Sequence, residues 1–484
     1  MNKVIINRNG LLLEATNHEP ITGFVERTFF VRRLVDKINK YGQRVGMEQG
    51  PPEPQYRHQG ERLIMPVGLW YRLKTMMNET KIPYEYHDLR NKEWPKPDFK
   101  NISRQGYKLR PGQPELLAKM VTADIGRISN PTGSGKTFII CMFVLLYPKA
   151  KILIVTEGLT PFNALFRRLV EVHPNIGRVG GGKHDLRKIT LCNRDSLHKA
   201  PLEEFDWILV DECHTMATSN AAPKFSKGNT DAKIFGFSAT PTGRHDGSDM
   251  LSEVMFGPII HEVPYQVSRA RGNVSQINVL MFDVPKGPLV GGYQNDITRK
   301  RHAYWRNVYR NKCIAYVAKE IIPADEQQLI IVDTIEHALR IRKLLPEWAA
   351  AYRPPQSKKD EKMLKFVVEG LIKEEAILTK KMLEELELQF EKGGVLKAIA
   401  NSVWHKAVDF TKLEWLIRAD GGRGKIGNLQ IAGRLSRLHD DNVKQLVDFY
   451  DSFDAIPRGR SEARLREYKK QGWTIERRAL PAMG

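Results

Sequence analysis

A glycine-rich loop at residues 130–137 constrains the fold of this chain more than any other feature of its sequence. It reads Asn-Pro-Thr-Gly-Ser-Gly-Lys-Thr, and the apolar run Phe138 to Leu146 follows it. Glycines turn backbone N–H groups toward phosphate oxygens, the lysine supplies a positive charge, and the last hydroxyl can ligate Mg²⁺. The pattern predicts a phosphate loop followed by a helix, although Asn130 stands where the pattern has its first glycine. The predicted nucleotide-binding residues of the loop are Thr132, Gly133, Ser134, Gly135, Lys136 and Thr137.

A second motif consists of two acidic residues at the end of an apolar run. Asp211, Glu212, Cys213 and His214 directly follow the run Trp207–Val210. An aspartate at the end of a strand can hold Mg²⁺, usually through water, and an adjacent glutamate can polarise an attacking water. We therefore expect Asp211 and Thr137 to be the metal ligands and Glu212 to be the general base of a nucleotide hydrolase.

Composition favours several domains and a polyanionic partner. A chain of 484 residues exceeds what one hydrophobic core usually supports. It carries 76 Lys and Arg against 56 Asp and Glu, a net charge of +20, which makes nucleic acid the first candidate partner. No run of 18 apolar residues occurs, so we expect a cytoplasmic protein with no membrane segment. The four cysteines lack the spacing of a zinc site.

The first part of the chain divides into an accessory domain and an α/β lobe. Residues 1–97 form the predicted N-terminal domain, which ends in the proline-rich linker Trp94 to Pro97. Residues 104–264 alternate strand-like and helix-like patterns, as a parallel α/β sheet does. The strands predicted for this lobe are Ile152–Thr156, Ile189–Cys192, Trp207–Val210 and Ile234–Phe237.

The second part contains a further α/β lobe. Residues 265–310 are predicted as a linker, residues 311–450 as the second lobe, and residues 451–484 as a basic tail. A helical insertion at about 355–395 is rich in Lys and Glu, and its apolar stripe is shorter than the heptads of a coiled coil, which favours solvated helices over a partner-binding coil. The elements predicted for the second lobe are a strand at Gln328–Asp333, a helix at Ile335–Leu345 and a strand at Leu413–Ile417.

A third motif lies near the end of the second lobe. Gln430 to Arg437 reads Gln-Ile-Ala-Gly-Arg-Leu-Ser-Arg, so Arg434 and Arg437 share one face of a predicted helix. If this lobe closes over nucleotide held by the first, both arginines can stabilise charge on the γ-phosphate. Such arginine fingers contribute about 10³ to 10⁵ in rate. Taken alone, the motif is also compatible with a helix that exposes two basic residues.

The three motifs and their order along the chain resemble those of the superfamily 2 helicases and translocases. Within this superfamily they resemble the group that contains the UvsW-type and XPB-type enzymes. The resemblance spans about residues 105–472, with 130–137 as motif I, 211–214 as motif II in its DECH form, and 430–437 as motif VI. It implies two RecA-like parallel-sheet lobes, a small N-terminal α+β domain, and ATP and Mg²⁺ as cofactors. The catalytic residues that it implies are Glu212, Asp211, Lys136, Arg434, Arg437 and Gln430.

Other blocks of the chain are similar to further motifs of this family. The segment Leu109 to Gln113 looks like the LRxxQ segment, which implies adenine recognition by Arg110 and Gln113. The segment Ser238 to Pro241 is similar to motif III, which links hydrolysis to the grip on nucleic acid, here through Ser238 and Thr240. Motif IV is expected at Gln328–Leu345.

Three blocks depart from the family pattern. Motif Ia, at 156–167, has Asn163 for the usual glutamine, and motif Ib begins with Asn193 for the usual threonine. Motif V, at 401–409, has Asn401 for threonine and Ala407 for glycine. The residues for which the resemblance implies nucleic-acid contact or coupling are Asn163, Asn193, Ser196 and Asn401, and Asp409 is the residue of motif V for which it implies nucleotide contact.

We therefore expect an ATP-dependent DNA helicase or translocase that remodels forked or branched DNA in replication, recombination or repair. It would act as a monomer in a bacterial or phage-infected cell. The alternatives are an ATP-dependent RNA helicase, the motor subunit of a restriction-type translocase, and a non-catalytic nucleic-acid binding module.

Two basic segments leave alternatives open. The stretch Arg458 to Arg478 can contact phosphates, or it can be a solvated helix docked by Leu465, Tyr468 and Trp473. In the N-terminal domain, Lys37, Lys40 and Arg44 would suit DNA binding, but a small packing domain is the alternative.

Overall fold

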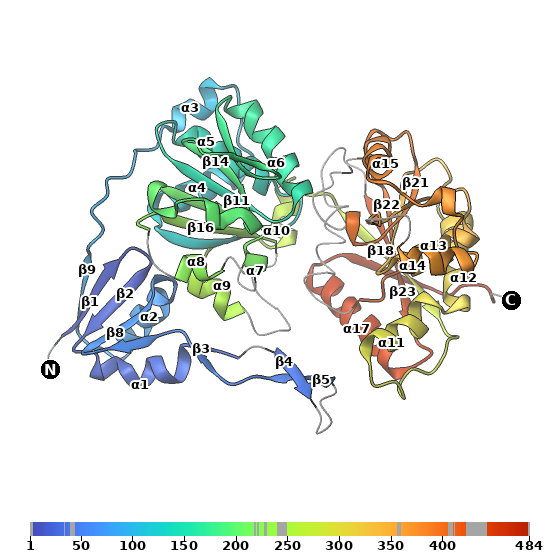
Figure 1. Cartoon of the computed structure of the whole chain (residues 1–484), viewed down its shortest axis with the longest axis horizontal. Coiled ribbons are helices and arrows are strands. Elements are labelled where there is room, and N and C mark those ends of the chain that lie inside the picture. Colours follow the sequence, from blue (N-terminus) through green and yellow to red (C-terminus); the bar gives the residue numbers. More distant parts are fainter. Residues whose placement is uncertain are drawn as a thin grey trace. The chain divides into compact units, whose positions relative to one another are not determined.

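The computed structural model describes residues 3–32, 34–38, 44–216, 219, 222–226, 230–239, 249–355, 360–404, 410, 412–422 and 443–482. The chain forms two compact units (Figure 1). One contains residues 1–131 and 135–264, and the other contains residues 265–484 together with Thr132–Ser134. Among the helices of the described ranges, none has the length and apolarity needed to cross a lipid bilayer.

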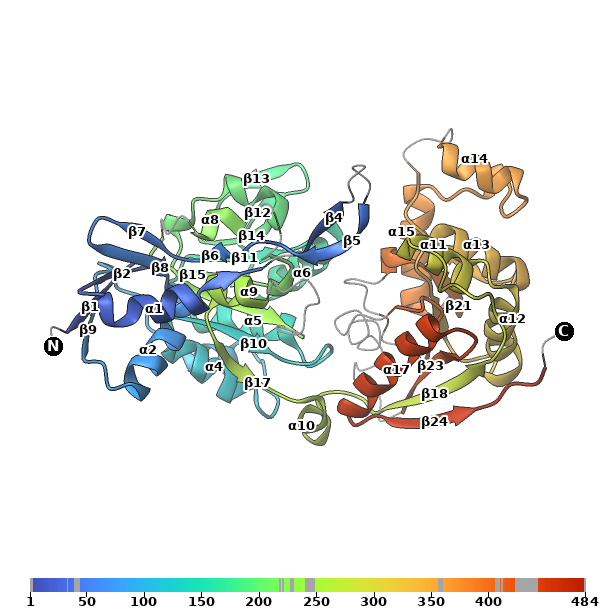
Figure 2. The same ribbon diagram turned by 90° about the horizontal axis from the view of Figure 1, so that it is seen from below.

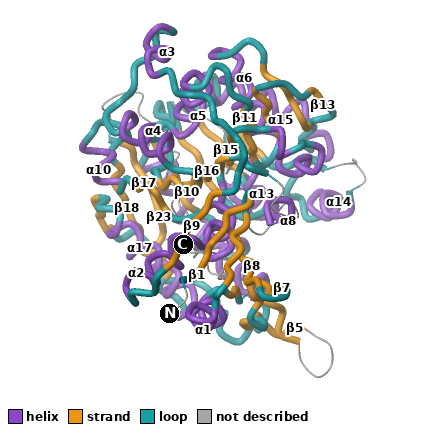
Figure 3. Tube along the Cα trace, turned by 90° about the vertical axis from the view of Figure 1, so that its left-hand side faces the viewer, coloured by secondary structure: helices purple, strands orange, loops and turns teal. Residues whose placement is uncertain are grey.

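The first unit begins with an α+β domain. Its five-stranded sheet has the order β7-β8-β2-β1-β9, in which β9 runs parallel to β1 and the other pairs are antiparallel. Figure 3 shows β9, β1 and β8 of this sheet, and Figure 2 shows α1 and α2 of the same domain. Buried residues of β1, β2, β8, α1 and α2 belong to one apolar core. The elements are β1 (Val4–Asn9), β2 (Leu12–Thr16), α1 (Glu19–Thr28), β7 (Arg57–Gln59), β8 (Arg62–Pro66), the 3₁₀ turn η1 (Val67–Leu69), α2 (Trp70–Glu79) and β9 (Tyr84–Asp88). Two small antiparallel pairs accompany them: β3 (Phe30–Val31) with β6 (Glu53–Pro54), and β4 (Leu34–Ile38) with β5 (Arg44–Gln49).

A parallel α/β lobe completes the first unit. Its eight strands have the order β13-β12-β14-β11-β15-β16-β10-β17, and only the β12–β13 pair is antiparallel. The strands are β10 (Ile125–Ser129), β11 (Ile152–Thr156), β12 (Ile176–Gly180), β13 (Lys183–Asp185), β14 (Ile189–Asn193), β15 (Trp207–Val210), β16 (Lys233–Ser238) and β17 (Ile259–Glu262). Helical elements of this lobe include α3 (Phe99–Arg104), α4 (Gln113–Thr122), α5 (Lys136–Leu146), α6 (Leu159–Val172), η2 (Arg194–Lys199), α7 (Cys213–Met216) and α9 (Asp249–Phe256). The four predicted strands are confirmed as β11, β14, β15 and β16.

Two apolar cores cover the two faces of this sheet. On one face, Ile152 and Ile154 pack in a core with residues of α4, α5 and α6. On the other face, Leu153 and Val155 share a core with residues of α9 and of the N-terminal domain. Successive residues of β11 therefore enter different cores, since side chains alternate across a strand. This double burial explains why the strand is apolar along its length.

The second unit contains another parallel sheet, so the predicted pair of α/β lobes is confirmed. Its seven strands have the order β20-β21-β19-β22-β23-β18-β24, and each paired strand runs parallel to its neighbour. The strands are β18 (Ile277–Val284), β19 (Gln328–Ile331), β20 (Ala349–Ala351), β21 (Lys397–Ala400), β22 (Trp415–Arg418), β23 (Lys444–Asp451) and β24 (Thr474–Arg478). Helices of this unit include α12 (Val308–Tyr316), α13 (Ile335–Leu344), α14 (Glu361–Val368), α15 (Lys380–Lys392) and α17 (Ala455–Lys470).

Two segments of the second unit differ from the sequence prediction. Strand β18 lies inside the predicted linker 265–310, yet it pairs with β23 and β24 within the sheet. The predicted basic tail 451–484 supplies α17, which lies along the sheet, and the strand β24 (Figure 2). Strand β24 reads Thr-Ile-Glu-Arg-Arg and is largely exposed, because it is an edge strand with a single neighbour. The predicted helical insertion is confirmed as α14 and α15.

Candidate nucleotide and nucleic-acid site

Strand order brings the main motifs of the first unit to one edge of its sheet. Strands β15, β16 and β10 are adjacent and parallel, so their carboxyl ends meet at the same edge. The phosphate loop follows β10, Asp211 follows β15, and Ser238 ends β16. The loops also contact each other, because the backbone N–H of Asn130 donates to the carbonyl of Ser238 at 3.2 Å. Ligands of open parallel sheets bind at this edge.

The phosphate loop has the backbone that its glycines predict. Gly133 and Gly135 have φ angles of 85° and 90°, in the left-handed region that favours glycine. Helix α5 begins at Lys136, so the last two residues of the loop form its first turn. The Lys136 ammonium donates to the carbonyl of Asn130 at 3.2 Å and of Pro131 at 3.4 Å. This lysine is therefore held over its own loop, at the N-terminus of a helix, where an anion is favoured.

The acidic pair of motif II combines a partly buried carboxylate with an unusual backbone. Burial and the neighbouring Glu212 carboxylate raise the pKa of Asp211 to about 7, while the charge of Lys136 acts in the opposite direction. Glu212 has a φ angle of 49°, a conformation uncommon for a residue with a side chain. Such backbone strain costs on the order of 1–3 kcal/mol and concentrates at functional sites. The geometry supports distinct roles for these two adjacent acids.

His214 connects motif II with motif III. Its Nδ1 atom lies 3.3 Å from a carboxylate oxygen of Glu212 and 2.9 Å from Oγ of Ser238. His214 and Ser238 are both buried, at 4% and 0% exposure. Sequence reasoning predicted a coupling role for Ser238 but assigned none to His214. Nδ1 of His214 thus lies between the candidate base and the end of β16.

The predicted adenine reader lies beside the phosphate loop. Gln113 is buried at the start of α4, and its Oε1 accepts the backbone N–H of Arg110 at 2.9 Å. Its Nε2 would be 3.0 Å from a Cβ added at Gly135, so the amide and the loop are in direct contact. Arg110 is exposed. Adenine recognition by these two residues stays a prediction.

The donor set at this edge fits Mg²⁺. Among the described residues there is no cluster of three or more His, Cys, Asp or Glu that could enclose a metal ion. Mg²⁺ commonly uses one or two carboxylates, substrate phosphates and water instead of a protein cage. The Asp211 carboxylate and the hydroxyl of the exposed residue Thr137 would hold the ion in this way.

A second group of predicted residues lies at the ends of β11 and β14. Asn163 is exposed near the start of α6, whereas Asn193 is buried and accepts the N–H of Asp195 at 3.0 Å, so it caps η2. Ser196 lies within η2 and is half-buried. Gly180 has a φ of 130°, and a Cβ there would lie 2.6 Å from Cβ of Asn193. The buried Asn193 therefore has a structural role in this turn.

Arg178 is a residue of this edge that sequence reasoning missed. Its guanidinium carbon lies 4.9 Å and 4.8 Å from the ring centres of Phe162 and Phe166. It donates to Oδ1 of Asn163 at 2.5 Å. This contact fixes the amide of Asn163 so that its oxygen faces the arginine and its NH₂ group faces away. Contacts between a strand and a helix leave no local signal in the sequence, which is why Arg178 was not predicted.

Several predicted residues lie outside the described residues. These are Thr240, Asp409, Gln430, Arg434, Arg437 and Lys40. For Lys37 and Arg44 the structure describes the backbone but not the side chain. Asn401 is described and buried, and its Oδ1 accepts the N–H of Val403 at 3.2 Å. The roles of all these residues stay predictions.

Part of the basic C-terminal stretch is unavailable to phosphate. Arg464 is fully buried, and its guanidinium pairs with Asp448 at 2.8 Å. Tyr468 and Trp473 are buried and stack with ring centres 5.4 Å apart, as the docked-helix alternative predicted. A phosphate contact by Arg464 is therefore wrong, because its charge is already neutralised inside the second unit.

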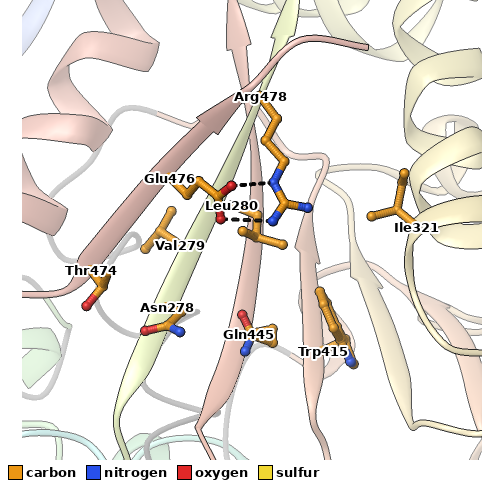
Figure 4. Close-up of a pocket in the computed structure, with 9 residues that line it drawn as sticks. All are labelled: Asn278, Val279, Leu280, Ile321, Trp415, Gln445, Thr474, Glu476 and Arg478. Atoms are coloured by element: carbon orange, nitrogen blue, oxygen red, sulfur yellow. Dashed lines mark hydrogen bonds and ion pairs between the residues drawn. The ribbon is translucent and has the colours of Figure 1, made fainter. Parts of the chain in front are cut away.

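A pocket of about 290 Å³ lies in the second unit (Figure 4). Its floor includes Asn278, Gln445 and Trp415, which neighbour one another across three parallel strands. They lie near the first residues of their strands. The ion pair of Glu476 with Arg478 closes one side. Because ligands of parallel sheets bind at the carboxyl ends, we assign this pocket no nucleotide role.

Comparisons with known proteins agree with the motifs. Residues 106–243, less than a third of the chain, match a family described as the type III restriction enzyme, res subunit. The search of curated proteins finds no match.

Solved structures show the same fold at low sequence identity. S. cerevisiae Dbp5 bound to RNA and ADP BeF3 aligns with 78% of this chain and 92% of its own, at 13% identity and a TM-score of 0.55. A fragment described as an HsdR subunit of a type I restriction enzyme from Vibrio vulnificus YJ016 aligns with 94% of this chain and 92% of its own, at 15% identity and a TM-score of 0.54. The crystal structure of T4 UvsW aligns with 99% of both chains at 17% identity, but its TM-score of 0.40 is too low to support a conclusion.

Proposed function

We propose that this chain, a superfamily 2 helicase by its matched segment and its two RecA-like lobes, couples ATP hydrolysis to movement along DNA and remodels forked or branched DNA. The observation that carries the proposal is the position of His214 beside the phosphate loop, with its Nδ1 atom 3.3 Å from Glu212 and 2.9 Å from Ser238. This residue adjoins both the candidate base and the end of a strand that can report on a bound polymer. The net charge of +20 suits a polyanionic track.

In the proposed reaction, the loop residues hold ATP and Glu212 activates water. The water oxygen bonds to the γ-phosphorus while the bond to the β,γ-bridging oxygen breaks, and Glu212 accepts the water proton. Lys136 stabilises charge on the β- and γ-phosphates. When bound, Mg²⁺ neutralises charge on these phosphate oxygens. The products are ADP and inorganic phosphate.

Movement requires that the nucleotide change the affinity for the track. A ligand shifts a conformational equilibrium only by its differential affinity for the two states. We propose that the loss of the γ-phosphate changes the contact of Glu212 with His214, and that Ser238 passes this change to the residues that follow β16. Thr240, Arg434 and Arg437 are the further residues for which the motifs suggest a part in this step.

DNA is favoured over RNA by the DECH form of motif II and by the restriction enzyme subunit for which the matched family is named. The relative bound to RNA keeps an RNA helicase as the alternative. Motor motifs contact the phosphate backbone, and backbone contacts carry no base sequence information.

A panel of polymers tests which track is used. We expect ATPase turnover to rise most with forked DNA or a four-way junction, less with single-stranded or duplex DNA, and least with RNA. Turnover is measured at one stated salt concentration, because phosphate contacts weaken steeply with salt. Stimulation by RNA alone would contradict the proposal, and equal stimulation by all DNA forms would reject branched DNA as the preferred substrate.

Asn163→Asp tests the nucleic-acid contact at the ends of β11 and β14. The aspartate keeps an oxygen that accepts from Arg178, but it replaces the outward NH₂ donor by a negative oxygen. We expect the DNA concentration for half-maximal ATPase stimulation to rise about tenfold, which corresponds to about 1.4 kcal/mol.

Asn175→Asp is the matched control for this prediction. Asn175 is also exposed, and its side-chain oxygen also accepts a hydrogen bond from an arginine, Arg187, at 2.5 Å. It directly precedes the first residue of β12, whereas the proposed contact is at the carboxyl ends of the strands. An equal effect in both variants would show that added negative charge, rather than loss of a donor, weakens binding. No effect at Asn163 would reject this contact.

A further inference from the structure

The strand that leads into the phosphate loop is held at its beginning by three cations. Asp124, immediately before β10, pairs with Arg8 at 2.8 Å, Arg90 at 2.7 Å and Lys233 at 3.0 Å. Arg8 belongs to β1 of the N-terminal domain, Arg90 to the segment after β9, and Lys233 to β16. The start of β10 is therefore tied to the N-terminal domain as well as to its neighbour in the sheet.

A second set of ion pairs holds the middle of the same strand. Arg127 of β10 is buried, pairs with Glu253 of α9 at 3.3 Å, and donates to the carbonyl of Gly257 at 2.7 Å. The Glu253 carboxylate also accepts hydrogen bonds from Nε and Nη2 of Arg72, in α2 of the N-terminal domain, at 2.5 and 2.9 Å. Bidentate arginine–carboxylate pairs are geometrically specific. Arg72, Glu253 and Arg127 thus form a continuous relay between the N-terminal domain and β10.

The N-terminal domain also meets α9 through its backbone. A Cβ added at Gly68, in η1, would lie 2.2 Å from the carbonyl oxygen of Glu253 and 2.4 Å from that of Val254. Only glycine permits this approach, because backbone atoms cannot move aside as a side chain can. Met77 of α2 and Phe256 of α9 belong to the same apolar core. The relay therefore rests on a close-packed contact.

We propose that Arg72 and Glu253 are positioning residues through which the N-terminal domain sets the place of β10 and hence of the phosphate loop. Arg127 precedes Asn130, the first residue of that loop, by only three positions in an extended strand. A small displacement of the strand changes the distances between the loop N–H groups and the phosphates. Since coupling between sites is reciprocal, a ligand of the N-terminal domain that shifts α2 alters ATP affinity, and ATP alters the affinity of that ligand.

The relay is tested by Arg72→Ala, with Arg72→Lys as the conservative variant. Arg72 is 47% exposed, and without it Glu253 keeps Arg127 as a partner, so the variant leaves no buried carboxylate alone. We expect the dissociation constant of a fluorescent ATP analogue and the KM for ATP to rise about three- to fivefold, at the low end of typical site-to-site coupling. The kcat at saturating ATP stays within about twofold, and lysine restores part of the affinity.

Arg62→Ala is the matched control, because Arg62 forms an exposed ion pair with Glu14 inside the N-terminal domain. Affinity that stays unchanged in Arg72→Ala while the melting temperature falls would overturn the proposal, and so would an equal loss of affinity in Arg62→Ala. The proposal rests on the nucleotide site alone. All measurements are made without nucleic acid, so failure of the DNA motor would leave their outcome unaffected.

Gly68→Ala tests the same coupling without a change of charge. The added methyl group must separate η1 from α9, so we expect ATP affinity to fall in the same direction as in Arg72→Ala. Gly23→Ala, in α1, is the control, since its Cβ would meet only the flexible end of Arg27 at 3.7 Å. Unchanged affinity in a folded Gly68→Ala protein would overturn the proposal.

Discussion

Replacement of Lys136 by alanine is expected to lower ATP turnover by at least about 10²- to 10³-fold, the effect of removing one preorganised donor from an active site. The ammonium lies over the phosphate loop, within 3.2 Å of the Asn130 carbonyl. Charge develops on the phosphates during transfer, and a fixed positive charge stabilises it more than it stabilises the ground state. Release of phosphate is the measurement, with and without DNA.

Lys119→Ala is the matched control for this variant. Lys119 is an exposed lysine of α4 in the same lobe. It lies outside the predicted nucleotide-binding residues, so its loss should leave turnover at the level of the unmodified protein. Normal turnover in Lys136→Ala would reject residues 130–137 as the nucleotide site.

Replacement of Glu212 by glutamine should separate binding from hydrolysis. Glutamine has nearly the same shape as glutamate and is under the same steric strain at a backbone φ of 49°. It cannot accept the proton of the attacking water. We expect ATP to bind with nearly unchanged affinity while turnover falls about 10²- to 10⁴-fold, the contribution of a positioned general base. Equilibrium binding of ATP and single-turnover hydrolysis distinguish the two quantities.

Glu171→Gln, at an exposed position of α6, serves as the control for Glu212→Gln. Preserved turnover in Glu212→Gln would exclude this residue as the base. A loss of ATP affinity equal to the loss of turnover would instead assign Glu212 to binding.

Several inner strands of the first lobe were predictable because burial on two faces makes a strand apolar along its whole length. Strands β11 and β15 lie at the predicted positions, since each is an unbroken apolar run bounded by polar residues. Strands β18 and β24 were missed for different reasons. No recognised motif lies next to β18, so nothing in the sequence identified this segment as part of the sheet. Strand β24 is an edge strand, and its exposed residues show no apolar pattern.

The candidate site was predictable where one short segment contains both the chemistry and the backbone that presents it. The loop around Lys136 and the pair Asp211–Glu212 are of this kind. Contacts between distant segments could not be predicted, as with Arg178 and Asn163 or Arg72 and Glu253. Arg464 illustrates the opposite error. In the sequence it belongs to a basic stretch, but Asp448, which neutralises it, lies on another element.

The apolar core shared by the N-terminal domain and the first lobe also bears on how this chain can evolve. A domain that closes its own core can be gained, lost or exchanged as an independent module, since its removal exposes little apolar surface. Here Val4, Leu13 and Met77 lie in one core with Val155 and Phe256. Removal of the accessory domain would therefore uncover apolar side chains of the lobe, so the two do not behave as independent modules.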